Sequence, residues 1–280
     1  MVDTKERKTE KFTVSKLSPQ SSSFWRIAED IPRSLSWILF AISIVLPILI
    51  WLLISKYAGI EPIFLPSPSG VVEALGNLWS KGYLGKDIGA SFTRVSLGFL
   101  ISAIVAVPLG IMMGTFASIR ALFEPIIGII RYMPAPAFIP LLIIYLGIDE
   151  APKIALIFIG TVFFNVLMIM DSVKFVPRDL IETTYTLGGN RWQVLSQVIS
   201  PYIVPRIIDT FRVNMAASWN LVVVAELLAA TEGLGKRILL AQKFLKTDEI
   251  FACLIILGLI GFAIDLFFRL LLRFTCKWAL

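Results

Sequence analysis

Six long apolar segments constrain the fold of this chain more than any other feature of its sequence. Each is close to the ~20 residues that an α-helix needs to cross the hydrocarbon core of a bilayer. The mean hydropathy of +0.81 and a hydrophobic content of 57% are typical of integral membrane proteins. The sequence therefore predicts an all-α membrane protein with about six transmembrane helices, at residues 36–56, 95–117, 122–147, 153–171, 211–230 and 250–272.

The polar segments around these stretches predict one membrane domain with a tail. Residues 1–34 are polar and basic and are expected to form a cytoplasmic tail, and residues 35–280 a single transmembrane domain. The net charge of +6 comes from Lys and Arg spread over the loops, which fits membrane orientation and argues against nucleic-acid binding. With both termini in the cytoplasm, the basic residues are moderately enriched on that side. The same orientation places the long loop 172–210 in the cytoplasm.

Several residue types that common catalytic sites require are missing from the sequence. There is no histidine, which removes the commonest metal ligand and proton shuttle. No Gly-Lys-Ser or Gly-Lys-Thr occurs, so the chain has no phosphate-binding Walker loop. Cys253 and Cys276 are expected to pack in or beside the last apolar segment and not to form a disulfide. We therefore expect no enzymatic activity, no metal site and no cofactor in this chain.

The stretch 176–205, hereafter the 176–205 hairpin, has the pattern of a helix–turn–helix in water. Asp179 is predicted to cap a first helix, with Glu182 reaching back in a capping box. Gly188, Gly189 and Asn190 tolerate positive φ and should end that helix. A second helix is predicted to follow from Trp192, with Pro201 as its end.

The third apolar segment contains an arginine and several prolines. Each proline removes a backbone donor that hydrocarbon cannot replace, so broken backbone at this depth should line a pathway or pack against protein. Arg131 either meets an anion in an aqueous pathway or forms a structural pair with Glu226 or Glu124. The alternative for the whole segment is a kinked packing helix.

Polar residues in two other apolar segments are expected to face the interior of the helix bundle. Asn214 and Ser218 are one helical turn apart and therefore share a face. Asp265 and Arg269 have the same spacing and are predicted to form a local ion pair. The candidate pathway residues are Arg131, Tyr132, Pro134, Pro136, Asn165, Asn214, Ser218, Asn220 and Glu226.

These motifs resemble one family. The 176–205 hairpin is similar to the EAA loop of ATP-binding-cassette (ABC) importer permeases, with Thr at both Ala positions and Ser200 where Leu is usual before the proline. Three further stretches look like the branch of that family for nitrate, aliphatic sulfonates, taurine or bicarbonate, and the similarity runs over about 60–275. The matching residues are Glu182-Thr183-Thr184, Gly188, Val198 and Pro201 in the loop, Leu65-Pro66-Ser67-Pro68, Arg131 to Pro140, and Ala225-Glu226 with Gly233-Leu234-Gly235.

The resemblance implies a type I importer permease in the bacterial inner membrane. It implies a homodimer that docks on two ATPase subunits, which bind ATP and Mg, and that receives substrate from an extracytoplasmic solute-binding protein. The expected substrate is a small anion, with a sulfonate or taurine first and nitrate or bicarbonate next. The alternative is a secondary anion carrier or channel, for which Glu226 and Asp265 would be the candidate coupling-ion sites. The residues that the resemblance assigns to ATPase coupling are Glu182, Thr183, Thr184, Tyr185, Leu187, Gly188, Trp192 and Pro201.

Overall fold

The computed structural model describes residues 31–279, so most of the predicted 1–34 tail lies outside the described residues. Every regular element in the described part is helical. The chain divides into two compact units, residues 1–58 and 59–280. The first unit contributes one described helix, α1 (Arg33–Tyr57), which includes Pro47 and is long and apolar enough to span a bilayer.

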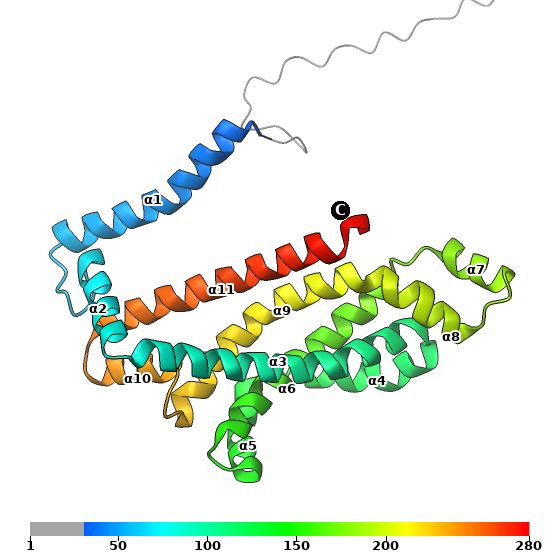
Figure 1. Cartoon of the computed structure of the whole chain (residues 1–280). Helices are drawn as coiled ribbons and strands as arrows, with labels where there is room; N and C mark the ends of the chain where they lie inside the picture. The colour runs from blue at the N-terminus through cyan, green and yellow to red at the C-terminus, as the bar shows by residue number, and fades with distance from the viewer. Residues whose placement is uncertain (1–30, 280) are drawn as a thin grey trace, which may run out of the picture. The chain divides into compact units, whose positions relative to one another are not determined.

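The second unit is a helical bundle followed by a short C-terminal 3₁₀ turn (Figure 1). Its elements are α2 (Pro68–Ser80), α3 (Tyr83–Thr115), α4 (Ala117–Ile130), the 3₁₀ turn η2 (Ala135–Phe138), α5 (Ile139–Leu146), α6 (Glu150–Val173), α7 (Arg178–Thr186), α8 (Arg191–Gln193), the π-helical turn η3 (Val194–Ile199), α9 (Ser200–Ala229), α10 (Leu234–Lys243), α11 (Thr247–Thr275) and η4 (Lys277–Ala279).

The helices α3, α6 and α9 form the centre of this unit, with α7 and α8 at one end and α2 and α10 at the other (Figure 1). Their shared core is aliphatic, and its fully buried residues include Ala106, Met113, Val166, Ile169 and Ile203. The two cysteines are buried and free, which confirms that they pack and do not form a disulfide.

All six predicted apolar segments coincide with helical structure. By length and composition, α1, α3, α6 and α11 can each cross a membrane, and α4 with η2 and α5 would make a fifth span that bends by 85°. The remaining predicted segment, 211–230, lies within α9, which is 30 residues long. The prolines of the third segment therefore break the helix as predicted.

The second predicted segment is too short at its N-terminal end. The prediction began this segment at residue 95, whereas α3 begins at Tyr83. The residues that made this stretch look like a loop are polar, yet Asp87, Ser91 and Arg94 are all buried on one face of α3. Hydrogen bonds to other helices satisfy these three side chains, so helix formation is compatible with their polarity.

A short helix, α2, begins directly after Ser67. The Ser67 hydroxyl accepts a hydrogen bond from the Gly70 N–H at 3.2 Å, and Pro68 occupies the first helical position. Val71, Ala74 and Leu78 are buried against the bundle, while Trp79 remains exposed.

Glycines allow α3 and α6 to approach closely. A Cβ added at Gly110 would lie 2.8 Å from the Val166 carbonyl oxygen and from Ile169 Cβ, and similar clashes occur at Gly98 and Gly114. Small residues at helix contacts serve the same purpose in membrane proteins generally, because tight packing replaces the hydrophobic effect there. The Gly98–Gly110–Gly114 stripe therefore sets the α3–α6 spacing.

This packing predicts different outcomes for two glycines of the same helix. Gly110→Ala should destabilise the protein by about 1–3 kcal/mol, because the added methyl group would overpack a contact that has no room for it. Gly89→Ala meets open space and should be neutral or stabilising by up to about 1 kcal/mol. Thermal unfolding in detergent measures both, and equal melting temperatures for the two variants would contradict the assignment of the stripe.

Candidate functional site

The turn of the 176–205 hairpin is built on two glycines with different roles. The Gly188 N–H donates to Tyr185 O at 3.0 Å and the Gly189 N–H to Thr184 O at 2.8 Å, which is the Schellman pattern at a helix C-terminus. Gly188 has φ of +83°, and a Cβ on Gly189 would lie 2.8 Å from Thr184 O. Position 188 requires glycine because of its positive φ, and position 189 requires glycine because a side chain would clash with Thr184. The predicted end of the first helix at these glycines is confirmed.

The capping box lies after this turn and not before the first helix. The prediction for Asp179 and Glu182 is wrong, because Pro177 occupies the N-cap of α7 and offers no side-chain acceptor. Asn190 caps α8 instead: its Oδ1 accepts from the N–H groups of Trp192 and Gln193, both at 3.0 Å. The Gln193 Oε1 in turn accepts from the Asn190 N–H at 2.8 Å.

Pro201 does not end the second helix, which corrects another prediction. The chain passes from α8 through the π-turn η3 directly into α9, where Pro201 lies in the first turn. Inside this continuous helix the proline removes one backbone hydrogen bond, and the π-turn directly before it is the local departure from α-helical bonding that accompanies it. The Ser200 hydroxyl donates to Leu195 O at 2.7 Å, so this carbonyl is also satisfied.

The hairpin has a buried base and an exposed tip. Val194, Ile199 and Ile203 belong to the core shared by α3, α6 and α9. At the tip, the side chain of Leu187 is 82% exposed, and Tyr185 and Trp192 are also exposed. The proposed coupling residues Glu182, Thr183, Gly188 and Pro201 are exposed, and Thr184 is half-buried.

At the opposite end of the bundle lies a buried ionic group, the Arg94 cluster, made of Asp87, Ser91, Arg94, Glu150 and Glu226. Glu226 has no exposed surface, and its Oε1 accepts from Arg94 Nη1 and from the Ser91 hydroxyl, each at 2.7 Å. Arg94 also binds Glu150 through both Nε and Nη2, the latter at 2.9 Å. Bidentate pairs of this kind are strong and fix the orientation of both groups.

The Arg94 cluster also caps the N-terminus of α10. The backbone N–H groups of Gly233, Leu234 and Gly235 donate to Asp87 Oδ1, Ser91 Oγ and Glu226 Oε2 at 2.9, 3.0 and 2.8 Å. A Cβ on Gly233, whose φ is +133°, would lie 2.4 Å from the Glu226 carboxyl carbon. The Ala-Glu and Gly-Leu-Gly stretches are therefore one structural unit, in which the glycines let the backbone approach the carboxylate.

A second polar group, here called the polar column, joins α3, α6 and α9. Asn165 Nδ2 donates to Ser102 Oγ at 3.0 Å, and Asn214 Nδ2 donates to Asn165 Oδ1 at 2.7 Å. The Ser218 hydroxyl donates to Asn214 O at 3.1 Å, which confirms that these two residues share a face. All four side chains are buried between helices of one chain.

The broken segment places Arg131 at the C-terminus of α4, where its side chain is exposed. The guanidinium lies 4.9 Å from the centre of the Tyr132 ring and donates to the Tyr132 hydroxyl at 3.1 Å. Glu226 binds Arg94 instead, so the predicted alternative of an Arg131–Glu226 pair is wrong. Within residues 31–279, no ion pair joins Arg131 to Glu124 either.

The nine candidate pathway residues therefore fall into two sets. Arg131, Tyr132, Pro134 and Pro136 are exposed on the break, and Asn220 is exposed on α9. Asn165, Asn214, Ser218 and Glu226 are buried within the bundle. Arg94 was not among the predicted site residues, although the spacing of Asp87, Ser91 and Arg94 on one helical face was a usable signal.

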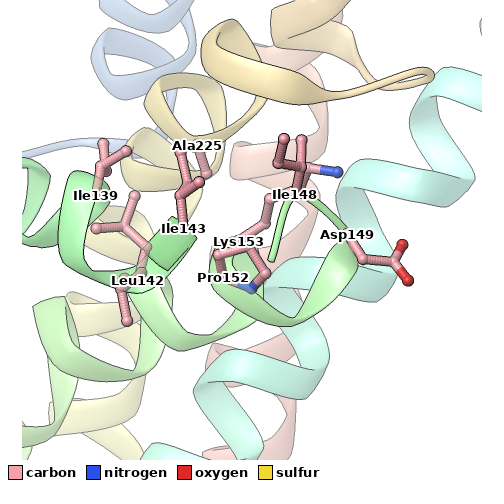
Figure 2. A pocket seen from close by; sticks show the side chains of 9 residues that line it. Ile139, Leu142, Ile143, Ile148, Asp149, Pro152, Lys153 and Ala225 are labelled. Atoms are coloured by element: carbon pink, nitrogen blue, oxygen red, sulfur yellow. The ribbon is translucent and has the colours of Figure 1, made fainter. Parts of the chain in front are cut away.

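A small apolar pocket lies between α5, α6 and α9 (Figure 2), and its lining residue Lys153 donates to Glu150 of the Arg94 cluster. Ile139, Leu142 and Ile143 line it from α5, Pro152 and Lys153 from α6, and Ala225 from α9. Its volume of about 20 Å³ is room for one water and not for an organic anion. This pocket is a small packing defect between α5, which follows the break after Arg131, and the helices α6 and α9.

The predicted ion pair of α11 is also present. Arg269 Nε donates to Asp265 Oδ2 at 2.7 Å, and Arg212 Nη1 lies 3.8 Å from Asp265 Oδ1. Both carboxylates proposed as coupling-ion sites for a secondary carrier, Glu226 and Asp265, are thus engaged by arginines.

Comparison with known proteins defines the class to which this architecture belongs. The model of the family described as "Binding-protein-dependent transport system inner membrane component" matches residues 106–275, and the chain belongs to this family. It is a transporter permease of the ABC importer class and not an enzyme. Membership implies a multi-pass protein of the inner membrane, with an ATPase and a binding protein as partners.

Individual relatives lie in one branch of the family. The taurine transport system permease TauC of Escherichia coli K12 is 33% identical over 234 residues, which cover 82% of this chain and 85% of TauC. The putative aliphatic sulfonates permease SsuC of Bacillus subtilis is 32% identical, with 82% and 84% covered. The nitrate import permease NrtB of Synechocystis is 29% identical, with 82% and 86% covered.

Solved structures share the fold. A bacterial ABC transporter involved in import of the acidic polysaccharide alginate superposes with a TM-score of 0.62 at 15% identity, covering 87% of this chain and 97% of that one. The inward-facing MetNI methionine ABC transporter gives a TM-score of 0.55 at 19% identity, covering 76% and 98%. The predicted type I importer fold is confirmed.

The Arg94 cluster yields a stability prediction. Arg94→Met leaves Glu226 as a buried charge without its cation, which should cost about 3–5 kcal/mol. The Arg94→Met/Glu226→Gln double variant should recover part of this loss, because Gln is uncharged and can still accept from Gly235. Melting in detergent measures both variants, and a double variant less stable than the single one would refute the pairing.

Proposed function

We propose that this chain forms a homodimeric translocation pathway for a small anion, driven by ATP hydrolysis on two partner ATPase subunits. ATP and Mg would be bound by those partners, and an extracytoplasmic binding protein would deliver the substrate. The observation that carries this proposal is the 176–205 hairpin, which exposes an apolar tip while its base is continuous with α9. Both termini are proposed to be cytoplasmic, which places this tip on the ATPase side.

The geometry supports mechanical coupling through the hairpin. Leu187, Tyr185 and Trp192 would insert into a groove on the ATPase, and the buried Val194 and Ile199 would transmit its movement to the bundle. Interiors packed this tightly move as rigid bodies, so displacement of the tip would displace α9. Asn214, Ser218, Asn220 and Glu226 lie on α9 and would move with it.

A sulfonate such as taurine is the proposed substrate class. TauC and the Bacillus SsuC are somewhat more similar to this chain than NrtB, which favours a sulfonate over nitrate or bicarbonate. Arg131 supports an anion, since its exposed guanidinium carries no carboxylate partner within the described residues. A second copy facing the exposed side of the break would enclose this cation on a symmetry axis.

A secondary carrier is the less favoured alternative. It would need titratable or ion-binding groups that are free to exchange their partners. The two candidate carboxylates are both engaged in ion pairs with arginines. Uptake of taurine into proteoliposomes should therefore require the ATPase, the binding protein and ATP together, and uptake driven by an ion gradient alone would favour the carrier.

Coupling can be tested at the turn of the hairpin. Gly188→Val places a β-branched residue at φ of +83°, which should distort the tip and uncouple ATP hydrolysis from uptake. Gly82→Val is the matched control, because Gly82 also has a positive φ of +71° but lies between α2 and α3 at the other end. Transport and ATPase stimulation in proteoliposomes are the measurements. Normal coupling in Gly188→Val would refute the role of this turn.

The pathway role of Arg131 has a separate test. Arg131→Met should reduce anion uptake about tenfold or more, the equivalent of one lost charge-assisted hydrogen bond. Assembly with the ATPase and basal hydrolysis should persist, and Arg273→Met, at an exposed position on α11, should leave uptake unchanged. A well-assembled Arg131→Met complex with full uptake would remove Arg131 from the pathway.

A further inference from the structure

The turn between α10 and α11 holds a leucine in a conformation that normally favours glycine. Leu245 has φ of 56° and is the one non-glycine residue with positive φ among the described residues. The Leu245 N–H donates to Gln242 O at 3.1 Å and the Lys246 N–H to Ala241 O at 2.9 Å, so Leu245 occupies the left-handed position of a Schellman motif. A leucine there is strained relative to glycine.

The strained turn presents large apolar side chains to the outside. Leu245 is 66% exposed and Phe244 is 71% exposed. Trp79, at the end of the neighbouring helix α2, is exposed as well. Because folding alone would favour glycine at 245 and polar residues beside it, these side chains point to a contact with an apolar phase outside the chain.

A pocket lined by both charged and apolar side chains lies directly beside this turn. Its volume is about 230 Å³, and residues of α2, α10 and α11 line it together with Lys81 and Tyr83. Arg237 donates through Nε to the buried Asp87 at 2.7 Å and lies 4.3 Å from the centre of the Tyr83 ring. Lys246 donates to Glu249 at 2.9 Å.

The charges around the pocket do not cancel. Arg237 is balanced by Asp87 and Lys246 by Glu249, but the Lys81 ammonium has no ion pair within the described part of the chain. The Arg237 guanidinium makes no other hydrogen bond there, so its two Nη groups are still available as donors. The pocket therefore carries one excess positive charge and several N–H donors, which suits a singly charged phosphodiester.

The pocket also lies at the end of the bundle where two candidate membrane spans begin. Two of the helices long and apolar enough to cross a membrane begin here, α3 at Tyr83 and α11 at Thr247. Lysines and aromatic residues gather at the boundary between water and hydrocarbon in membrane proteins. Lys81, Tyr83 and Lys246 lie within two residues of these helix starts, so they are candidates for this boundary.

We propose that this pocket binds the phosphodiester headgroup of an anionic phospholipid, with Phe244 and Leu245 in the adjoining acyl region. Lys81, Lys246 and Arg237 would hold the phosphate, and the strained turn would keep the two apolar side chains directed into the bilayer. The proposal requires α3 and α11 to cross the membrane but does not require transport activity.

The test compares lipids that copurify with the protein from nanodiscs containing equal amounts of phosphatidylglycerol and phosphatidylcholine. After mild delipidation, native mass spectrometry should show phosphatidylglycerol enriched on the wild-type chain. Lys81→Gln/Lys246→Gln should lower the ratio of the two lipids by about fivefold per lysine removed. Lys174→Gln/Lys277→Gln makes the same charge change at exposed positions outside the pocket and should leave the ratio unchanged.

Two further measurements separate the possible sources of the effect. Leu245→Gly should raise the melting temperature in detergent, because it relieves the strained φ, while total lipid retention falls.

Inorganic phosphate should not bind the delipidated protein in calorimetry, and binding that the double variant abolishes would identify a free-anion site instead. An unchanged lipid ratio in the double variant overturns the proposal. If the double variant kept the wild-type lipid ratio but no longer bound the solute-binding protein, the surface would be a protein contact.

Discussion

The buried carboxylate of Glu226 is the interaction on which the rest of this structure depends most. A carboxylate without exposed surface is tolerated only when charges and donors surround it, and here Arg94, Ser91 and the Gly235 N–H do so. These partners come from α3 and from the start of α10, so satisfying one charge joins three helices. Arg94 extends the connection to α6 through Glu150. The end of the bundle opposite the hairpin is thus held by electrostatics, whereas the centre is held by close packing of glycines against aliphatic residues.

The parts of the fold that sequence reasoning predicted are those governed by local rules. Hydropathy located all six apolar segments, the prolines located the break near Arg131, and Gly188 located the turn of the hairpin. The resemblance of 182–201 to the EAA loop identified the class, which the family match to residues 106–275 confirms.

The errors arose where tertiary contacts outweigh those rules. Arg94 was missed because a polar stretch at the start of an apolar segment looks like a loop until its partners Glu150 and Glu226, 56 and 132 residues away, are known. The capping box was placed at Asp179 since the pattern fits, but Asn190 and Gln193 fit it equally and Pro177 excludes the first site. Pro201 looked like a terminator because the sequence does not reveal that a π-turn leads directly into α9.

That π-turn has a geometric consequence for the whole helix. A turn with i→i+5 hydrogen bonds holds more residues than an α-helical turn with 3.6, so it changes the angular phase of every side chain beyond it. One residue corresponds to a rotation of about 100° around the helix axis. The face of α9 that carries Asn214 and Ser218 therefore points toward Asn165 because η3 lies between it and the hairpin. With regular α-helical bonding at η3, the face of Asn214 and Ser218 would be turned relative to the hairpin, so the π-turn sets the angular register between these two parts of α8–α9.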